Sequence, residues 1–597
     1  MKRKLALLLA FIMAFLLIAG CDGGSKPGPV ESSEPAGSAD STTKPAVDPT
    51  EAPSPTEVDT SDLNLNLCIA SEPETLDPNM SSSVDAATYT HHMFEGLMRY
   101  VATGDTVGED SEMKDTAIGF GQAESYEVST NDAGQPVYTF TLRDDIFWSD
   151  GEPVKADDFE YSWKRIVDPA LAADYGYILN GIVLNAAKIQ DEEADPSELG
   201  IVALDERTLE ITLEAECPYF VELCAFAALM PLRKDVIEKH GAAWTDPGNM
   251  VSNGAFVLTE WVHDSYIKMA PNEKYYEADD ISNLTLTWWL SDSATAMLSA
   301  YESGEYDFFD SPPLDRIEDL QASGDAFIAP YVGTYYTYLN TERIKDWRVR
   351  AALVLSVDRD YLVESVTQGG QTAATGFVPS GITDSEGDDW AEKRPNVMFN
   401  QLQEKYPDYD LSDYTGRAEL AQFLYNEAVD EGAWDPNTTL VYNYNTSEAH
   451  KVIAEALQSD WSSVLGVNIT LANQDWNVYT AGLGEGNFDV ARLGWIADYN
   501  DAITFLELLA TGNSYNYGRW ASDDYTKLIN SAKEVPGGEE RDQFLTDAEI
   551  LHFDEGGFTV NPLYYYTNTY CRSSALTNVE YTSFGYFFFH YADKSVD

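Results

Sequence analysis

Apolar and polar residues follow two rhythms along this chain. Residues 138–142 (Tyr-Thr-Phe-Thr-Leu) alternate at every second position, which is typical of a half-buried strand. Turn residues follow at 149–151, and two aspartates then open a segment in which Phe159, Trp163 and Ile166 share one helical face. Helices that alternate with short strands in this way predict an α/β fold with mixed sheets.

A second helix is expected over residues 449–465, because its apolar residues recur at helical spacing on one stripe. The stripe consists of Val452, Ile453, Ala456, Leu457 and Trp461. Gly466 ends this helix, and residues 467–471 have the pattern of the strand that follows.

The longest apolar run, over residues 5–20, follows the basic residues Lys2, Arg3 and Lys4. This order is typical of a secretory signal, and the run is shorter than the roughly 20 residues that cross a bilayer as a helix. Residues 18–21 (Ile-Ala-Gly-Cys) resemble the bacterial lipoprotein processing site, which implies cleavage after residue 20 and a diacylglycerol on Cys21. The alternative is an ordinary signal peptide, or a short membrane helix, with an incidental cysteine.

Residues 21–62 are rich in serine, proline, threonine, glycine and acids and have almost no large apolar side chains. Such a composition cannot bury a core, so it predicts a flexible acidic tether. The remaining chain of this 597-residue protein is long enough for two or three lobes. A formal net charge of -65 argues against nucleic acid or anionic lipid as a partner and favours cationic ligands. An acidic surface that is merely solvated is the alternative.

Motifs of catalysis are missing from the sequence: it has no HExxH, GxSxG, Walker A, dinucleotide-binding or EF-hand pattern. We predict no enzyme, no catalytic residue, no cofactor and no metal. The neighbours His91 and His92 are expected at a helix surface or core edge rather than as metal ligands. Besides Cys21, four cysteines leave three disulfide pairings open, namely those among Cys68, Cys217, Cys224 and Cys571.

One stretch, residues 489–501, combines aromatic and charged side chains at the end of an apolar strand. The strand is expected to end at Gly494, and Arg492 and Asp498 lie within seven residues of each other. A glycine lets another backbone approach closely, and an arginine and an aspartate suit the two ends of a zwitterion. A buried ion pair between them is the alternative.

Several segments, in order along the chain, resemble the extracellular solute-binding proteins of family 5, which serve peptide ABC importers and bind oligopeptides or dipeptides. The strongest match is residues 138–168, which contain LRDDIFWSDGEPVKADDFEYSWKRIVD. The other matching segments are 71–78, 92–97, 252–256 with Trp261, 338–341 with 348–350 and 358–359, and 561–566.

The resemblance implies a type II, cluster C periplasmic-binding-protein-like fold, in which two lobes with mixed sheets and an extra inserted domain close about a hinge. The expected division begins with a signal peptide over 1–20 and the lipidated cysteine and linker over 21–62. Lobe I then takes residues 63–95, 231–332 and 567–597, the inserted domain takes 96–230, and lobe II takes 333–566.

The implied function is that of a monomeric lipoprotein on the extracellular face of the cytoplasmic membrane of a Gram-positive-type cell. It would capture oligopeptides between its lobes and deliver them to the permease subunits of an ABC importer. Two alternatives remain open: a receptor that senses peptide pheromones, and a family member that binds a dipeptide, nickel chelate, haem or oligosaccharide. A secreted hydrolase would need a nucleophile and base that the sequence does not offer.

Position by position, the resemblance assigns Asp498 to the peptide α-ammonium and Arg492 to the C-terminal end of the peptide. It implies backbone partners at Gly494, Ile496 and Val84, and aromatic pocket walls at Tyr175, Tyr331, Tyr336, Trp476, Trp495 and Tyr566. The chain departs from the family at three positions: Gly333 and Ile496 replace a pair of cysteines of some Gram-negative relatives, and Leu483 replaces a second ligand-facing arginine.

Overall fold

The computed structural model describes residues 64–595. The predicted signal peptide, Cys21 and the linker over 21–62 lie outside these residues. Within the described range, no helix has both the length and the apolarity needed to cross a membrane. The predicted α/β class with mixed sheets is confirmed, because helices alternate with strands that pair both in parallel and antiparallel.

An 11-stranded sheet forms the centre of the molecule. Its strands follow one another in space as β15 (Asn468–Gln474), β14 (Thr439–Asn445), β16 (Val490–Ile496), β12 (Ala326–Leu339), β17 (Val560–Arg572), β11 (Phe308–Asp310), β1 (Asn64–Ala70), β10 (Thr285–Leu290), β9 (Tyr266–Pro271) and β8 (Phe256–Val262), and β13 (Thr372–Ala373) pairs with β17. Three smaller sheets are also present. The first consists of β2 (Met98–Val107), β3 (Asp110–Phe120), β19 (Val579–Tyr581) and β20 (Phe587–Phe588), and the second of β4 (Ala123–Thr130), β5 (Pro136–Leu142), β7 (Thr208–Thr212) and β6 (Ile201–Ala203). The third consists of β18 (Leu576–Thr577) and β21 (Asp593–Lys594).

Helices cover these sheets. They are α1 (Val84–Met93), α2 (Ala156–Ile166), α3 (Ala186–Gln190), α4 (Phe220–Leu223), α5 (Lys234–His240), α6 (Ala294–Glu302), α7 (Ile317–Ser323), α8 (Trp347–Leu355), α9 (Arg359–Tyr361), α10 (Trp390–Lys393), α11 (Val397–Lys405), α12 (Tyr414–Asp430), α13 (Glu448–Leu465), α14 (Trp476–Glu485), α15 (Ile503–Leu506), α16 (Asp523–Glu534) and α17 (Glu539–His552).

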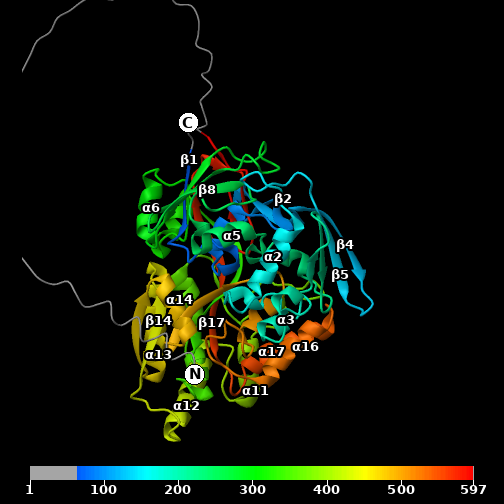
Figure 1. Cartoon of the computed structure of the whole chain (residues 1–597). Helices are drawn as coiled ribbons and strands as arrows, with labels where there is room; N and C mark the ends of the chain where they lie inside the picture. The colour runs from blue at the N-terminus through cyan, green and yellow to red at the C-terminus, as the bar shows by residue number, and fades with distance from the viewer. Residues whose placement is uncertain (1–63, 596–597) are drawn as a thin grey trace, which may run out of the picture. The chain divides into compact units, whose positions relative to one another are not determined.

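Strands β12 and β17 connect the two halves of the large sheet. One half contains β14, β15 and β16, the other contains β1 and β8 to β11, and the antiparallel pair of β12 and β17 borders both. In Figure 1, β14 with α13 and α14 lies in the lower part of the view, and β8 with α6 lies in the upper part. The ladder between the two strands shifts register between Pro330 and Thr334. A proline has no N–H to donate, so the ladder is weakest there.

Local sequence signals explain the elements near the site. Helix α2 buries Phe159, Trp163 and Ile166, as its spacing predicted. Helix α13 starts at Glu448 and ends before Gly466, which adopts φ of 70°. Its stripe is only partly a core face, because Ile453, Leu457 and Trp461 are buried whereas Val452 is 45% exposed and borders a cavity.

The histidine pair and the cysteines belong to the interior. His92 is fully buried in α1, where one ring nitrogen lies 2.8 Å from the Thr88 carbonyl oxygen and the other accepts from the Phe589 N–H. Burial lowers the pKa of His91 to about 3 and that of His92 to about 4. Both rings are therefore neutral core groups. The four cysteines Cys68, Cys217, Cys224 and Cys571 are free thiols, so none of the three possible pairings is formed.

Candidate functional site

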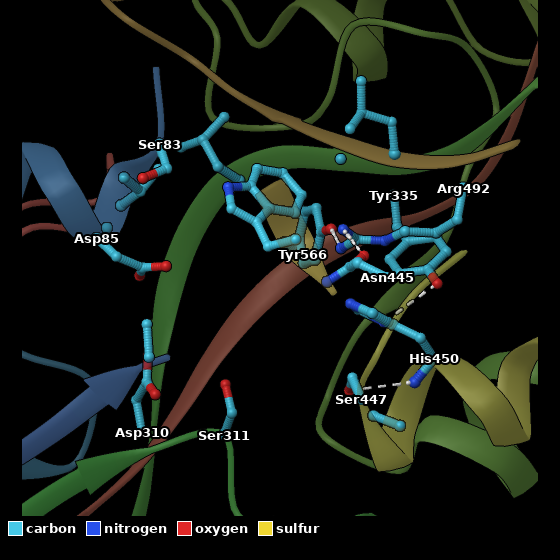
Figure 2. Close-up of a pocket in the computed structure, with 18 of the residues that line it drawn as sticks. Ser83, Asp85, Asp310, Ser311, Tyr335, Asn445, Ser447, His450, Arg492 and Tyr566 are labelled. Atoms are coloured by element: carbon cyan, nitrogen blue, oxygen red, sulfur yellow. Dashed lines mark hydrogen bonds between the residues drawn. The ribbon is translucent and has the colours of Figure 1, made fainter. Parts of the chain in front are cut away.

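A cavity of about 1450 Å³ lies beside β12 and β16. Residues from both halves of the large sheet line it, and Figure 2 shows several of them facing a common space. Ten of the eleven predicted ligand-facing residues are brought together there: Val84, Tyr175, Tyr331, Trp476, Arg492, Gly494, Trp495, Ile496, Asp498 and Tyr566.

The exception is Tyr336, whose predicted place in the pocket wall is wrong. Its ring is fully buried and packs edge-on against Phe377 and Tyr338, with 5.1 Å between ring centroids in both cases. Successive side chains of a strand point to opposite faces, so it is the preceding residue of β12, Tyr335, that lines the cavity. The sequence pattern of two adjacent tyrosines does not tell which of them faces the ligand.

Strand β16 extends to Ile496 and does not end at Gly494 as predicted. It pairs with β12 along its whole length, but β14 pairs with it only at Val490 and Ala491. The segment from Arg492 to Ile496 therefore has one edge that no described strand covers.

The parity of β16 determines which backbone groups face this edge. The Ala497 N–H bonds to the Val332 carbonyl near β12, whereas the Arg492 carbonyl accepts from the Tyr479 hydroxyl on the other side. In a strand, both backbone groups of a residue point to one side, and alternate residues point to opposite sides. Gly494 and Ile496 therefore direct their N–H and C=O groups to the uncovered edge, as Arg492 does.

Asp498 follows β16 directly, and its carboxylate is held from two sides. The Tyr175 hydroxyl donates to Oδ1 at 2.8 Å, and the Thr504 hydroxyl donates to Oδ2 at 3.1 Å. The residue is only 6% exposed and forms no ion pair with a described cation. Burial raises the pKa of Asp498 to about 8, although these two hydrogen bonds act in the opposite direction. A bound ammonium group would supply the missing positive charge.

Arg492 occupies the other end of the edge. Its guanidinium donates to the Tyr566 hydroxyl and to Asn445 Oδ1, both at 3.1 Å, and lies 4.7 Å from the Tyr335 ring centroid. These partners are all neutral, and no described carboxylate forms an ion pair with it. The alternative of a buried ion pair between Arg492 and Asp498 is therefore wrong. The part of β16 from Arg492 to Ile496 spans about 14 Å, and Asp498 lies two residues beyond it.

Two glycines let neighbouring side chains lie close to the backbone of β16 and β12. A Cβ at Gly494 would lie 2.1 Å from the Tyr566 hydroxyl oxygen, so this ring can cover the strand only at a glycine. Gly333 and Ile496 are direct partners across the β12–β16 ladder, and a Cβ at Gly333 would meet the Ile496 side chain at 2.3 Å. The two positions that carry cysteines in some relatives thus face each other here without a cross-link.

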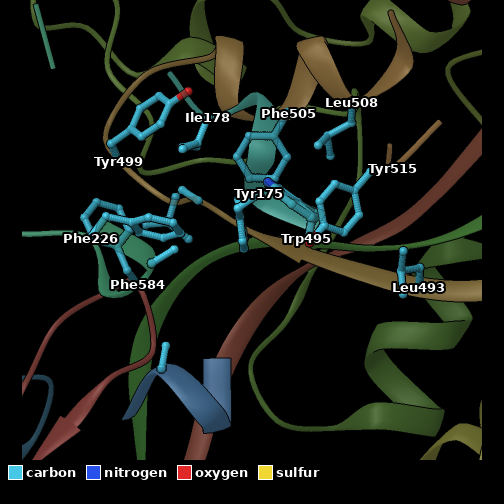
Figure 3. Close-up of a cluster of buried hydrophobic side chains, with 14 of the residues drawn as sticks. Tyr175, Ile178, Phe226, Leu493, Trp495, Tyr499, Phe505, Leu508, Tyr515 and Phe584 are labelled. Atoms are coloured by element: carbon cyan, nitrogen blue, oxygen red, sulfur yellow. The ribbon is translucent and has the colours of Figure 1, made fainter. Parts of the chain in front are cut away.

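An aromatic cluster supports the Asp498 end of the cavity. Tyr175 packs against Phe226 with a centroid separation of 4.9 Å, and Trp495 packs against Tyr515 at 4.8 Å (Figure 3). Trp495 is therefore a core residue as much as a cavity wall, and its indole N–H donates to the Thr504 hydroxyl. This packing fixes the rotamers of the groups that hold Asp498.

Around the cavity, hydrogen bonds join segments that are far apart in the sequence. The Ser514 hydroxyl donates to the Asp174 carbonyl at 2.8 Å, and the Asn500 N–H donates to Glu222 at 3.0 Å. On another side, the Thr295 hydroxyl at the start of α6 donates to Glu448 at the start of α13 at 2.9 Å. The cavity walls are thus held together by direct hydrogen bonds in addition to β12 and β17.

Acidic side chains greatly outnumber basic ones in the cavity lining. Nine carboxylate residues line the cavity, namely Glu72, Glu74, Asp85, Asp174, Asp292, Asp310, Asp315, Glu448 and Asp498. Arg492 is the one lysine or arginine in the described lining, and burial together with Arg492 lowers the pKa of His450 so that this ring is neutral. Sequence reasoning missed Tyr335, Asp85 and Asp310, although the position of Asp85 next to Val84 was a usable signal.

Comparisons with known proteins show which proteins this chain is similar to. A model of bacterial extracellular solute-binding proteins, family 5 (middle part), matches residues 121–517. The oligopeptide-binding protein OppA of Bacillus subtilis is 31% identical over 525 residues, which cover 86% of this chain and 90% of that protein.

Among solved structures, the murein tripeptide binding protein MppA of Escherichia coli superposes with a TM-score of 0.78 at 30% identity, over 90% of this chain and 99% of that one. The unliganded open form of MppA gives a TM-score of 0.55 at 31% identity, over 86% and 94%. The arrangement of this chain is therefore closer to the first MppA structure than to the open form.

Proposed function

Because the chain belongs to the bacterial extracellular solute-binding proteins of family 5, we propose that it captures oligopeptides in the cavity beside β16. Proteins of this family have the type II periplasmic-binding-protein fold and bind solutes for transport; they are not enzymes. One observation carries the proposal. Two buried ionisable groups, Asp498 and Arg492, stand at the two ends of a strand edge that no described strand covers, and neither forms an ion pair with a described residue.

The geometry suits an extended peptide that runs antiparallel to β16. Its α-ammonium would pair with Asp498, its backbone with the groups of Gly494 and Ile496, and its carboxylate would lie towards Arg492. A strand advances about 3.4 Å per residue, so this edge of about 14 Å between the two anchors fits short peptides. Backbone pairing does not depend on side-chain identity, which gives a route to broad specificity.

The proposal includes attachment and delivery. Cys21 would carry a lipid that holds the protein at the extracellular face of the cytoplasmic membrane, with residues 21–62 as the tether. The protein would act as a monomer and pass its ligand to the permease of an ABC importer. Lobe I (63–95, 231–332 and 567–597), with the inserted domain (96–230), and lobe II (333–566) would move about β12 and β17.

Mass spectrometry of the ligand retained after gentle purification of the full chain tests the proposal. We expect a mixture of short peptides, and calorimetry should then show that a free tetrapeptide binds and that its N-acetylated form does not. Recovery of a sugar, a haem or a metal chelate in place of peptides would overturn the proposal.

A further inference from the structure

Two further carboxylates, Asp85 and Asp310, line the cavity that holds the two proposed peptide anchors. In Figure 2, both lie on the side of the view opposite to Arg492. Asp85 stands in the first turn of α1, directly after Val84, and Asp310 is the last residue of β11. Two segments 225 residues apart thus present acids to the same space.

Neither carboxylate has a described positively charged side chain as its partner. No described lysine or arginine forms an ion pair with Asp85 or Asp310, and Asp310 Oδ1 is buried without a hydrogen-bond partner. The neighbouring Glu74 adds negative charge, although the N–H groups of Ser82 and Ser83 hold it at 2.7 and 3.0 Å. A buried acceptor with no donor is costly unless a ligand completes it.

The charge of Asp85 also acts on Asp310. Burial, followed by the charge of Glu74, raises the pKa of Asp85 to about 7, and burial with the charge of Asp85 raises the pKa of Asp310 far above its usual range. A carboxylate near another negative charge ionises less readily, and a cation beside it favours the ionised form. A cationic group beside Asp85 and Asp310 would therefore be stabilised by both carboxylates.

The surroundings favour an organic cation over a metal ion. Of the described residues, the one group of three ligands near enough for a metal is Asp384, Glu386 and Asp388, and Lys393 already bridges those three. Tyr331 lines the cavity, and Tyr566 packs against its ring with a centroid separation of 5.4 Å. Burial and the charges of groups that include Tyr581, Asp85 and Asp310 raise the pKa of Tyr331 well above its usual range. Aromatic faces suit the methylene stem and charged head of a lysine or arginine.

We propose that Asp85 and Asp310, flanked by Tyr331, form a side-chain pocket for a lysine or arginine residue of the bound peptide. The inference rests on the proposed function and narrows it: the protein prefers cationic peptides. The pocket differs from the Asp498 anchor because it takes a side chain, so it acts at one position of the peptide and does not need a free N-terminus.

Calorimetry with the full chain and two series of alanine tetrapeptides tests this pocket. Lysine is placed at each position in turn, and norleucine, which has the stem without the charge, replaces it in the matched series. At one position at least, lysine should bind about tenfold tighter than norleucine, on the scale of a charge-assisted hydrogen bond. In the double variant Asp85→Asn/Asp310→Asn, this ratio should fall to about one while norleucine peptides bind as before.

Asp292→Asn is the matched control, because this acid lines the same cavity but is exposed at its rim. It should leave the ratio unchanged. Equal binding of lysine and norleucine peptides at every position, or a ratio that survives the double variant, would overturn the pocket. So would binding of Ca²⁺ that Asp310→Asn abolishes, since the pair would then be a metal site. If no peptide of either series binds, it is the proposed function that fails.

Discussion

The Tyr175 hydroxyl donates a hydrogen bond of 2.8 Å to Asp498, 323 residues further along the chain. Tyr175 belongs to a 3-10 helix (Asp174–Tyr177) that follows α2, whereas Asp498 follows β16, so the bond joins two walls of the cavity. The same bond orients the carboxylate that we propose as the ammonium anchor. Ligand capture and the approach of the walls are therefore linked at one side chain.

Replacement of this carboxylate tests the anchor. We expect Asp498→Asn to weaken binding of a free tetrapeptide about 100-fold, because a desolvated ammonium would lose its charged partner. Asparagine keeps the shape and can still accept from Tyr175. Because burial raises the pKa of Asp498, the neutral amide should not destabilise the fold. Calorimetry and thermal unfolding measure the two effects, and unchanged affinity would remove Asp498 from the site.

The pH dependence of binding follows from the same group. In the unliganded chain the Asp498 carboxyl has a pKa of about 8, so it is largely protonated at pH 6.5. An ammonium ligand binds the ionised form, so affinity should rise between pH 6 and 7.5 and binding should release a proton. Calorimetry in buffers with different ionisation enthalpies measures this release, and the part due to Asp498 should vanish in Asp498→Asn.

The raised pKa of Asp498 also makes the free energy of unfolding depend on pH. The folded-state pKa of Asp498 lies above the value of about 3.9 for an unfolded chain, so the folded state binds the proton more tightly. The contribution of this carboxyl to the free energy of unfolding is therefore complete at low pH and falls as the pH rises from about 4 to about 8. Asp498→Asn should flatten this part of the unfolding profile, and a steeper profile would contradict the assignment.

Much of this site could be predicted from sequence, because Arg492 and Gly494 lie on one strand, where the period of two sets their faces, and Asp498 follows closely after it. The choice between Tyr335 and Tyr336 could not, since a register difference of one residue reverses every side chain of a strand. For α13, the apolar stripe marks residues that avoid water, but it does not distinguish Val452 at a cavity from Leu457 in a core.

The sequence could not predict that Asp85 and Asp310 face the same cavity. Their approach depends on α1 and on the parallel pairing of β1 with β11, which brings residues 67 and 308 together. Acidic residues are abundant in this chain, so no local pattern marks these two. Their distinguishing property is that both face one cavity and neither forms an ion pair with a described lysine or arginine, which only the packing of distant segments creates.

Arg492 should determine whether the ligand needs a free carboxyl terminus. We expect Arg492→Met to weaken binding of a free tetrapeptide about tenfold, and to leave its C-terminal amide, which lacks the negative charge, almost unaffected. Arg492→Lys is the control that keeps the charge but loses the planar fork towards Tyr566 and Asn445. Equal losses for the acid and the amide in Arg492→Met would show that Arg492 acts through packing rather than through the ligand carboxylate.

Gly494 should tolerate no side chain while Tyr566 covers it. In Gly494→Ala, the new methyl group would lie 2.1 Å from the Tyr566 hydroxyl oxygen and must displace the ring that bonds to Arg492. We expect a loss of about 1–3 kcal/mol in the free energy of unfolding, typical of overpacking, and weaker peptide binding. Chemical denaturation and calorimetry measure the two losses.

Gly484→Ala is the matched control, because this glycine lies in α14 and borders the same cavity, and a Cβ added to it would meet no atom within 4 Å. Alanine is the better helix former, so this variant should be as stable as the parent or more so. Addition of Tyr566→Phe to Gly494→Ala removes the atom that the methyl group meets. Partial recovery of stability in that double variant would assign the loss to this one contact, whereas no recovery would place the clash elsewhere on β16.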